Sequence, residues 1–160
     1  MSFKVAVIND TSVTMHYGCE RVMKNLRKLL TSIGMDVSFL WPVGEKLTDN
    51  DLPTSLDLII VNGEGTLHHD ADRERVGWLL EVPMLAKKRN CPAVLINATI
   101  YKNSDSFYEN IKCFDSIWCR DTYSQDLLRS KGVNSKYCPD LTMIYELKPC
   151  HNKMFRKKYC

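Results

Sequence analysis

The sequence predicts an α/β fold: a single domain built on a Rossmann-like, doubly wound parallel sheet. Short apolar segments alternate with longer amphipathic ones, as strands and helices do in such folds. The connections between the apolar segments are long enough for the crossover helices that parallel strands require, roughly a dozen residues or more. At 160 residues the chain can bury one core without disulfides or metals to support it.

The expected strands are short runs rich in aliphatic and aromatic residues that end near Gly, Pro, Asn or Asp. The first run is apolar almost throughout, which favours a central parallel strand over an alternating edge strand. Pro42 ends the second run. The six runs are residues 3–8, 37–41, 58–61, 93–96, 116–119 and 136–138.

The first expected helix is strongly amphipathic, and Gly34 follows it as a left-handed cap. Its apolar face carries Val22, Met23, Leu26, Leu29, Leu30 and Ile33, and its polar face carries Glu20, Arg21, Lys24, Arg27 and Lys28. A polar connector over residues 44–55 has room for one helical turn.

Three more helices are expected. The first runs over about residues 72–89 and should break at Pro83, because proline removes a backbone donor. The second covers residues 104–112. The third begins at Asp121, a favourable N-cap, and ends at Gly132.

The composition is that of an ordinary globular domain, and a net charge of +3 is too small to indicate a nucleic-acid partner. No apolar run reaches the roughly 18 residues of a membrane helix, and the chain opens on a strand without a signal-peptide pattern. We therefore expect a cytoplasmic protein. Residues 1–147 should form the domain, and residues 148–160 a polar, basic tail, for which a solvated end is favoured over a phosphate or membrane-surface patch.

The chain has seven cysteines, an odd number with no CxxC spacing. Structural zinc sites usually show such paired spacing, so neither a zinc site nor a disulfide framework is indicated. We expect free thiols that act mainly as small buried side chains. A catalytic cysteine stays open, but no sequence feature marks one. We expect no metal and no cofactor.

Ligands of open α/β sheets bind beyond the carboxyl ends of the strands, so the loops after the strands are the candidate sites. The loop after the first strand lacks GxGxxG, which argues against a dinucleotide cofactor. It does supply polar side chains suited to an anion or a sugar: Asn9, Asp10, Thr11 and Ser12. A purely local role in turns and caps is an equal alternative for this group. His16, at the start of the helix, is a candidate acid, base or donor.

The loop after the third strand carries the sharpest local signal. Gly63 and Gly65 flank Glu64 and allow a tight turn that aims a carboxylate and backbone amides at a ligand. Thr66 adds a hydroxyl and His68 a second candidate acid or base. A GxG turn also serves structure alone, and the adjacent histidines make a poor metal site.

Two further strand ends complete the candidate set. Asn97 follows the fourth strand and Arg120 the fifth, where a guanidinium can bind carboxylate or phosphate. Ser124 is a candidate contact, although its position after Asp121 also suits a helix cap. Asp140 is more readily a turn residue.

Taken in order, these loops resemble the polysaccharide pyruvyl transferase family over about residues 5–143. The matching elements are residues 9–12 with 16–19, 63–68, 95–99, Arg120 and Asp121 with Ser124, and 139–141. No single element is specific for the family, but the five elements in this order are. The resemblance implies a domain like one half of a GT-B glycosyltransferase fold. It also implies transfer of a pyruvyl group from phosphoenolpyruvate to a sugar of a cell-surface polysaccharide.

In this reading His16, His68 and Glu64 are the catalytic candidates. The substrate-binding candidates are Asn9, Asp10, Thr11, Ser12, Gly63, Gly65, Thr66, Asn97, Arg120 and Ser124. Members of the family are about twice as long, so a second domain or chain is expected to complete the cleft. The alternative is a non-catalytic carbohydrate-binding, anion-binding or protein-interaction module derived from the same fold. A nucleotide-binding regulatory domain ranks last, because only the fold supports it.

Overall fold

The computed structural model describes residues 2–144, so the expected tail at 148–160 lies outside the described residues. Its centre is a six-stranded sheet in the order β2-β1-β3-β4-β5-β6, with every neighbouring pair parallel. The strands are β1 (Phe3–Asp10), β2 (Met35–Pro42), β3 (Leu58–Asn62), β4 (Ala93–Ala98), β5 (Ser116–Cys119) and β6 (Lys136–Tyr137). The predicted α/β class and parallel sheet are confirmed.

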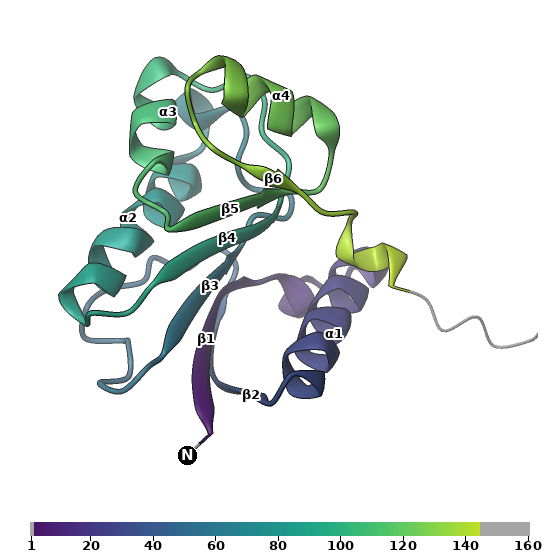
Figure 1. The fold of residues 1–160 in the computed structure, drawn as a ribbon, viewed down its shortest axis with the longest axis vertical. Coiled ribbons are helices and arrows are strands. Elements are labelled where there is room, and N and C mark those ends of the chain that lie inside the picture. The colour runs from purple at the N-terminus through teal and green to yellow at the C-terminus, as the bar shows by residue number, and fades with distance from the viewer. Residues whose placement is uncertain (1, 145–160) are drawn as a thin grey trace, which may run out of the picture.

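Helices cover the two faces of this sheet unequally (Figure 1). One face carries α1, and the other carries α2, α3 and α4. Alternation along β1 explains the split: Val5 and Val7 pack with α1, whereas Ala6 and Ile8 belong to the larger core on the other face. The helices are α1 (Tyr17–Ser32), α2 (Glu74–Lys88), α3 (Asp105–Ile111) and α4 (Thr122–Ser130), with short 3-10 turns η1 (Thr11–Thr14), η2 (Asp70–Asp72) and η3 (Leu141–Met143).

Two local expectations were wrong. The helix through Pro83 is continuous, because Leu79, Val82 and Ala86 are buried on the same helix and their packing holds it together. The connector at 44–55 forms turns without a helix. Arg89 fixes it instead, by donating to Asp49 and to backbone carbonyls of the connector.

The strand order changes direction at β1: the chain goes out to β2 and then crosses to β3 on the other side. In open α/β sheets, ligands bind at such a switch point, outside the carboxyl ends of the two strands. Asn9, the residue before the end of β1, lies in the left-handed region at φ 66°, and Asn97 has the same place in β4 with φ 54°. Register shifts accompany both residues. These bends turn the loops out from the sheet edge where the candidate residues lie.

Candidate functional site

Side-chain amides lock the loops after β1 and β3 together. Asn9 Nδ2 donates to the carbonyl of Asn62 at 2.6 Å and to the hydroxyl of Thr66 at 3.2 Å. Asn62 returns a bond of 3.3 Å to the Asn9 carbonyl. All three residues are buried, so these bonds replace water that cannot reach them. The switch point is thus a preformed, hydrogen-bonded unit.

Glu64 sits on this unit with its carboxylate held in place. Thr11 donates its hydroxyl to Glu64 Oε2 at 2.7 Å, and the Glu64 amide donates to Asn62 Oδ1 at 3.3 Å. The two flanking positions require glycine for different reasons. A Cβ at Gly63 would lie 2.8 Å from Cα of Ala98 on β4, whereas Gly65 adopts φ 65° in open space.

Asp10 and Ser12 are hydrogen bonded to each other. Asp10 Oδ1 accepts from the Ser12 amide at 2.9 Å and from its hydroxyl at 2.6 Å, which caps η1. Its other oxygen pairs with Arg27 of α1 at 3.1 Å. This geometry gives both residues the local role that was the alternative to ligand binding.

A cavity of about 650 Å³ opens beside Glu64. Its walls come from the η1 turn, the start of α1, the Glu64 loop and the first turns of α2. The lining combines hydroxyls, three carboxylates, two guanidiniums and an indole: Thr11, Thr14, Cys19, Val43, Glu64, Gly65, Thr66, Asp72, Arg73, Glu74, Arg75 and Trp78. Such a mixture can hydrogen bond a polyhydroxylated ligand and stack on one of its faces.

His16 lies at the rim of this region as the N-cap residue of α1, and its side chain makes no capping bond. Its Nδ1 instead lies 3.7 Å from Sγ of Cys19. His16 is exposed and Cys19 partly buried. An imidazole and a thiol are therefore paired at the start of a 16-residue helix.

His68 belongs to a second, more enclosed cluster. Its ring stacks on Tyr101 with centroids 4.7 Å apart, and its Nδ1 lies 2.8 Å from Nδ1 of His69. Arg73 Nη1 is 3.2 Å from His68 Nε2, and since a guanidinium only donates, Nε2 must accept. The network therefore assigns the His68 proton to Nδ1, which donates to His69. Burial, then Arg73 and His69, holds the pKa of His68 below its usual 6.5.

Arg120 is anchored at the carboxyl end of β5. Its Nε donates to the hydroxyl of Thr99, and its Nη1 pairs with Asp140 at 2.9 Å. Both members of the ion pair keep about a quarter of their side chains exposed, 27% and 25%. The guanidinium is thereby oriented along the same sheet edge while it stays accessible to a ligand.

Two predicted contacts lie inside the protein. Ser124 is fully buried, and its hydroxyl accepts from the Ile100 amide at 2.8 Å and contacts Asp121 at 2.9 Å. Asn97 is 6% exposed, and its Oδ1 accepts from the Leu141 amide at 3.3 Å. In this arrangement both residues shape loops around the edge rather than facing the cavity.

The family model of polysaccharide pyruvyl transferases matches residues 16–158. The chain belongs to the polysaccharide pyruvyl transferase family. Among solved structures, a functionally uncharacterised protein from Klebsiella pneumoniae is similar in fold, with a TM-score of 0.55 and 14% sequence identity. The match covers 91% of this chain and 53% of the Klebsiella protein, so the chain spans about half the length of that protein. No curated protein matches the chain.

The part of the chain that matches the pyruvyl transferase model includes His16, Glu64, His68 and Arg120, whereas residues 9–12 precede it. The structure brings Thr11, Glu64 and Thr66 together and places the His16 and Arg120 loops at the same carboxyl edge. The roles of these residues in a pyruvyl transferase stay predictions.

The sequence analysis missed several cavity residues, among them Arg73, Arg75 and Trp78. The sequence contained one indication of the two arginines. The first turn of a helix disfavours cations because of the helix dipole, yet α2 begins next to Arg73 and carries Arg75 as its second residue. Arginines in that position indicate a role that outweighs the local cost.

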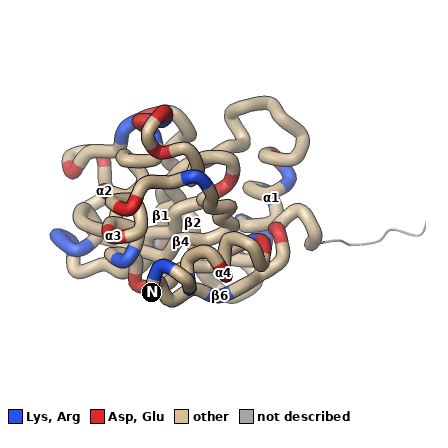
Figure 2. Tube along the Cα trace, turned by 90° about the horizontal axis from the view of Figure 1, so that it is seen from above, with Lys and Arg blue, Asp and Glu red and all other residues tan. Residues whose placement is uncertain are grey.

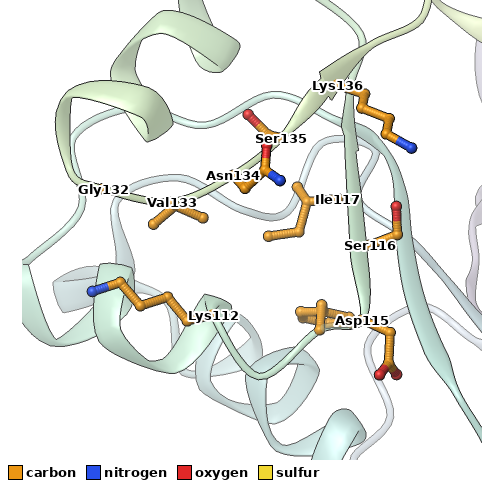
Figure 3. Close-up of a pocket in the computed structure, with 10 residues that line it drawn as sticks. Lys112, Asp115, Ser116, Ile117, Gly132, Val133, Asn134, Ser135 and Lys136 are labelled. Carbon is orange, nitrogen blue, oxygen red and sulfur yellow. The ribbon is translucent and has the colours of Figure 1, made fainter.

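Other parts of the molecule offer less chemistry. A cavity of about 350 Å³ lies at the amino end of β5, with Lys112 and Lys136 at opposite margins (Figure 3). Lys112 pairs with Glu109, and Lys136 covers the Trp118 ring. Basic and acidic residues are interspersed over the surface (Figure 2). Within residues 2–144, no three His, Cys, Asp or Glu side chains are grouped to hold a metal ion, and no helix is long and apolar enough to cross a membrane.

Proposed function

We propose that this chain is the saccharide-binding half of a polysaccharide pyruvyl transferase. The complete enzyme would transfer a pyruvyl group from phosphoenolpyruvate to a sugar of a cell-surface polysaccharide. Family membership supports the reaction class. The observation that carries the assignment to the sugar is the cavity beside Glu64, at the switch point of the sheet.

The charge of this cavity favours a sugar over phosphoenolpyruvate. Its lining has three carboxylates, Glu64, Asp72 and Glu74, against two guanidiniums, Arg73 and Arg75. A multiply charged anion would meet a net negative wall, which opposes binding. Sugar hydroxyls both donate and accept, so they suit carboxylates and guanidiniums alike. Trp78 offers an aromatic face for the apolar side of a pyranose ring.

Catalysis in this proposal needs a second domain or a second chain. The edge that carries the cavity also carries Arg120, which can bind the phosphate or carboxylate of phosphoenolpyruvate from this side. A facing domain, arranged as in GT-B enzymes, would supply the remaining cations and exclude water, on which electrostatic catalysis depends.

Three residues have proposed roles in the transfer. Glu64 accepts a sugar hydroxyl and can act as a base toward it, because the hydrogen bond from Thr11 engages only one of its two oxygens, Oε2. His68 is neutral at pH 7, as its lowered pKa implies, and serves better as a base or donor than as a strong acid. His16 is the more exposed candidate for proton donation.

Chemical-shift titration of the isolated chain tests the proposal. Methyl pyranosides should move the resonances of the Glu64 loop and the Trp78 indole with millimolar affinity, about −4 kcal/mol. Phosphoenolpyruvate should act near Arg120 and leave the Trp78 indole unmoved. Glu64→Gln should weaken sugar binding by roughly 1–3 kcal/mol, since a charge-assisted hydrogen bond is lost. Glu109→Gln, at an exposed carboxylate of α3, is the matched control and should change nothing.

The alternative is a module without catalysis that binds a carbohydrate, an anion or a protein. Pyruvyl transfer by the chain together with its second half would exclude it. If no pyranoside, phosphate or phosphoenolpyruvate moves the loop resonances, the saccharide-binding proposal fails and the protein-interaction alternative replaces it.

A further inference from the structure

Cys19 has no part in the proposed transfer, and it forms a thiol–imidazole pair with His16, the candidate proton donor. The two atoms, Sγ and Nδ1, are 3.7 Å apart, within hydrogen-bonding reach for sulfur. The thiol can donate to Nδ1, and the imidazole can take its proton, the arrangement that activates nucleophilic cysteines. Helix capping does not account for this contact, because the His16 side chain makes no capping bond.

The chain makes room for the imidazole at this position. A Cβ added to Gly18 would lie 3.3 Å from both Cε1 and Nδ1 of His16. Glycine between the two partners therefore lets the ring fold back over the helix start and meet the sulfur three residues on. A Cβ at this position would press on the ring, which would have to move by a few tenths of an ångström.

The sulfur lies at the start of a helix and on the wall of the cavity beside Glu64. Cys19 is the third residue of α1, where the amides of the first turn present partial positive charge. It also lines the 650 Å³ cavity, whose charged side chains are Arg73 and Arg75 together with Glu64, Asp72 and Glu74. The sulfur is partly exposed, so reagents can reach it.

The other described cysteines differ. Cys91 and Cys119 are buried, and burial raises the pKa of both thiols, that of Cys119 to about 12. Both should be inert. Cys113 and Cys138 are exposed and serve as internal references for an ordinary accessible thiol.

We propose that Cys19 is a peroxide-sensitive modification site, activated by His16, whose oxidation obstructs the cavity. The Cys19 proton passes to His16 Nδ1, and the sulfur electron pair attacks one oxygen of hydrogen peroxide. The O–O bond breaks, and the departing hydroxide takes the proton from the imidazolium and leaves as water. The sulfur becomes a sulfenic acid, oxidised by two electrons, while the peroxide is reduced. A small thiol then condenses with the sulfenic acid to give a mixed disulfide and water.

Competitive alkylation measures the activation directly. The full chain, freed of reductant, is treated with limiting iodoacetamide, and peptide mass spectrometry gives the rate at each cysteine. Cys19 should react at least about tenfold faster than Cys113 and Cys138. In His16→Asn, which keeps a good N-cap but removes the base, the Cys19 rate should fall to that of the references. Gly18→Ala should slow it through displacement of the ring.

Controls separate activation from unfolding. The rates at Cys113 and Cys138 should be unchanged in both variants, and Cys91 and Cys119 should stay unreactive, as they would not in an unfolded chain. With hydrogen peroxide and dimedone, Cys19 should carry the sulfenic-acid adduct in the native chain and lose it in His16→Asn. Equal alkylation of Cys19 and the two exposed cysteines, or a Cys19 rate indifferent to His16→Asn, would overturn the proposal. Neither outcome depends on sugar binding.

Discussion

Gly63 should be required by packing alone, and a pair of glycine-to-alanine substitutions can show it. At Gly63 the new Cβ would lie 2.8 Å from both Cα and Cβ of Ala98 and 3.2 Å from the Ile96 carbonyl oxygen. These atoms belong to strand β4, which cannot move without disturbing the sheet. Overpacking of this kind costs about 1–3 kcal/mol. For a chain of this size that corresponds to a fall in Tm of roughly 2–12 °C.

Gly77 provides the matched control. It lies in α2, and a Cβ there would meet no atom within 4 Å. Alanine is the better helix former by about 0.5–1 kcal/mol, so Gly77→Ala should raise Tm by roughly 1–4 °C. Thermal and urea unfolding followed by circular dichroism measure both variants. The steric reasoning is refuted if Gly63→Ala is as stable as the native chain, or if the two substitutions shift Tm in the same direction.

Three further outcomes are expected. Because the pKa of His68 is lowered in the folded state, the unfolded chain binds a proton at this residue more readily than the folded chain does. The stabilisation from neutral His68 is therefore complete above pH 6.5 and is lost as the pH falls below that value. In urea unfolding, a His68→Gln variant should lack this pH-dependent part of the unfolding free energy. Asn9→Ala should destabilise the fold by about 2–4 kcal/mol in the same assay, because it removes two buried hydrogen bonds and leaves alanine in the left-handed region. Asn9→Gly should recover the share of this loss that comes from the backbone conformation, since glycine adopts the left-handed region readily. Tm should be insensitive to reductant and to chelator, because the described cysteines are free; a fall of many degrees with either would contradict this.

The fold was predictable because strand and helix patterns are local. Each continuous apolar run could be assigned without knowing its neighbours, and the long connections then dictated parallel pairing. The strand ends were less predictable. β1 and β4 extend to Asp10 and Ala98, beyond the apolar runs, because asparagines in left-handed conformation continue the pairing after a register shift. Nothing in a one-dimensional hydrophobic pattern encodes that geometry.

The sheet edge that carries the candidate site was predictable from the sequence, but the side chains that surround each candidate residue were not. Parallel strands deliver their carboxyl ends to one edge, so the loops with Thr11, Glu64 and Arg120 could be placed together from the sequence. The partners of each side chain could not. Arg73 reaches His68 from the next element along the chain, a pairing set by where η2 directs the start of α2.

Two polar groups of the candidate site, Glu64 and Arg120, are already paired within this domain, and this bears on what the proposed function predicts for the isolated chain. Thr11 holds Glu64, and Asp140 orients Arg120, so neither group needs a second domain to fix its position. A preorganised group loses little entropy on binding, so sugar recognition should survive in the isolated chain. Transfer is different, because stabilisation of a developing charge depends on excluding water from both sides of the ligand. The proposed function therefore predicts that binding and catalysis separate: residues 2–144 should suffice to bind the sugar, and transfer should appear only when a second domain or chain closes the cleft.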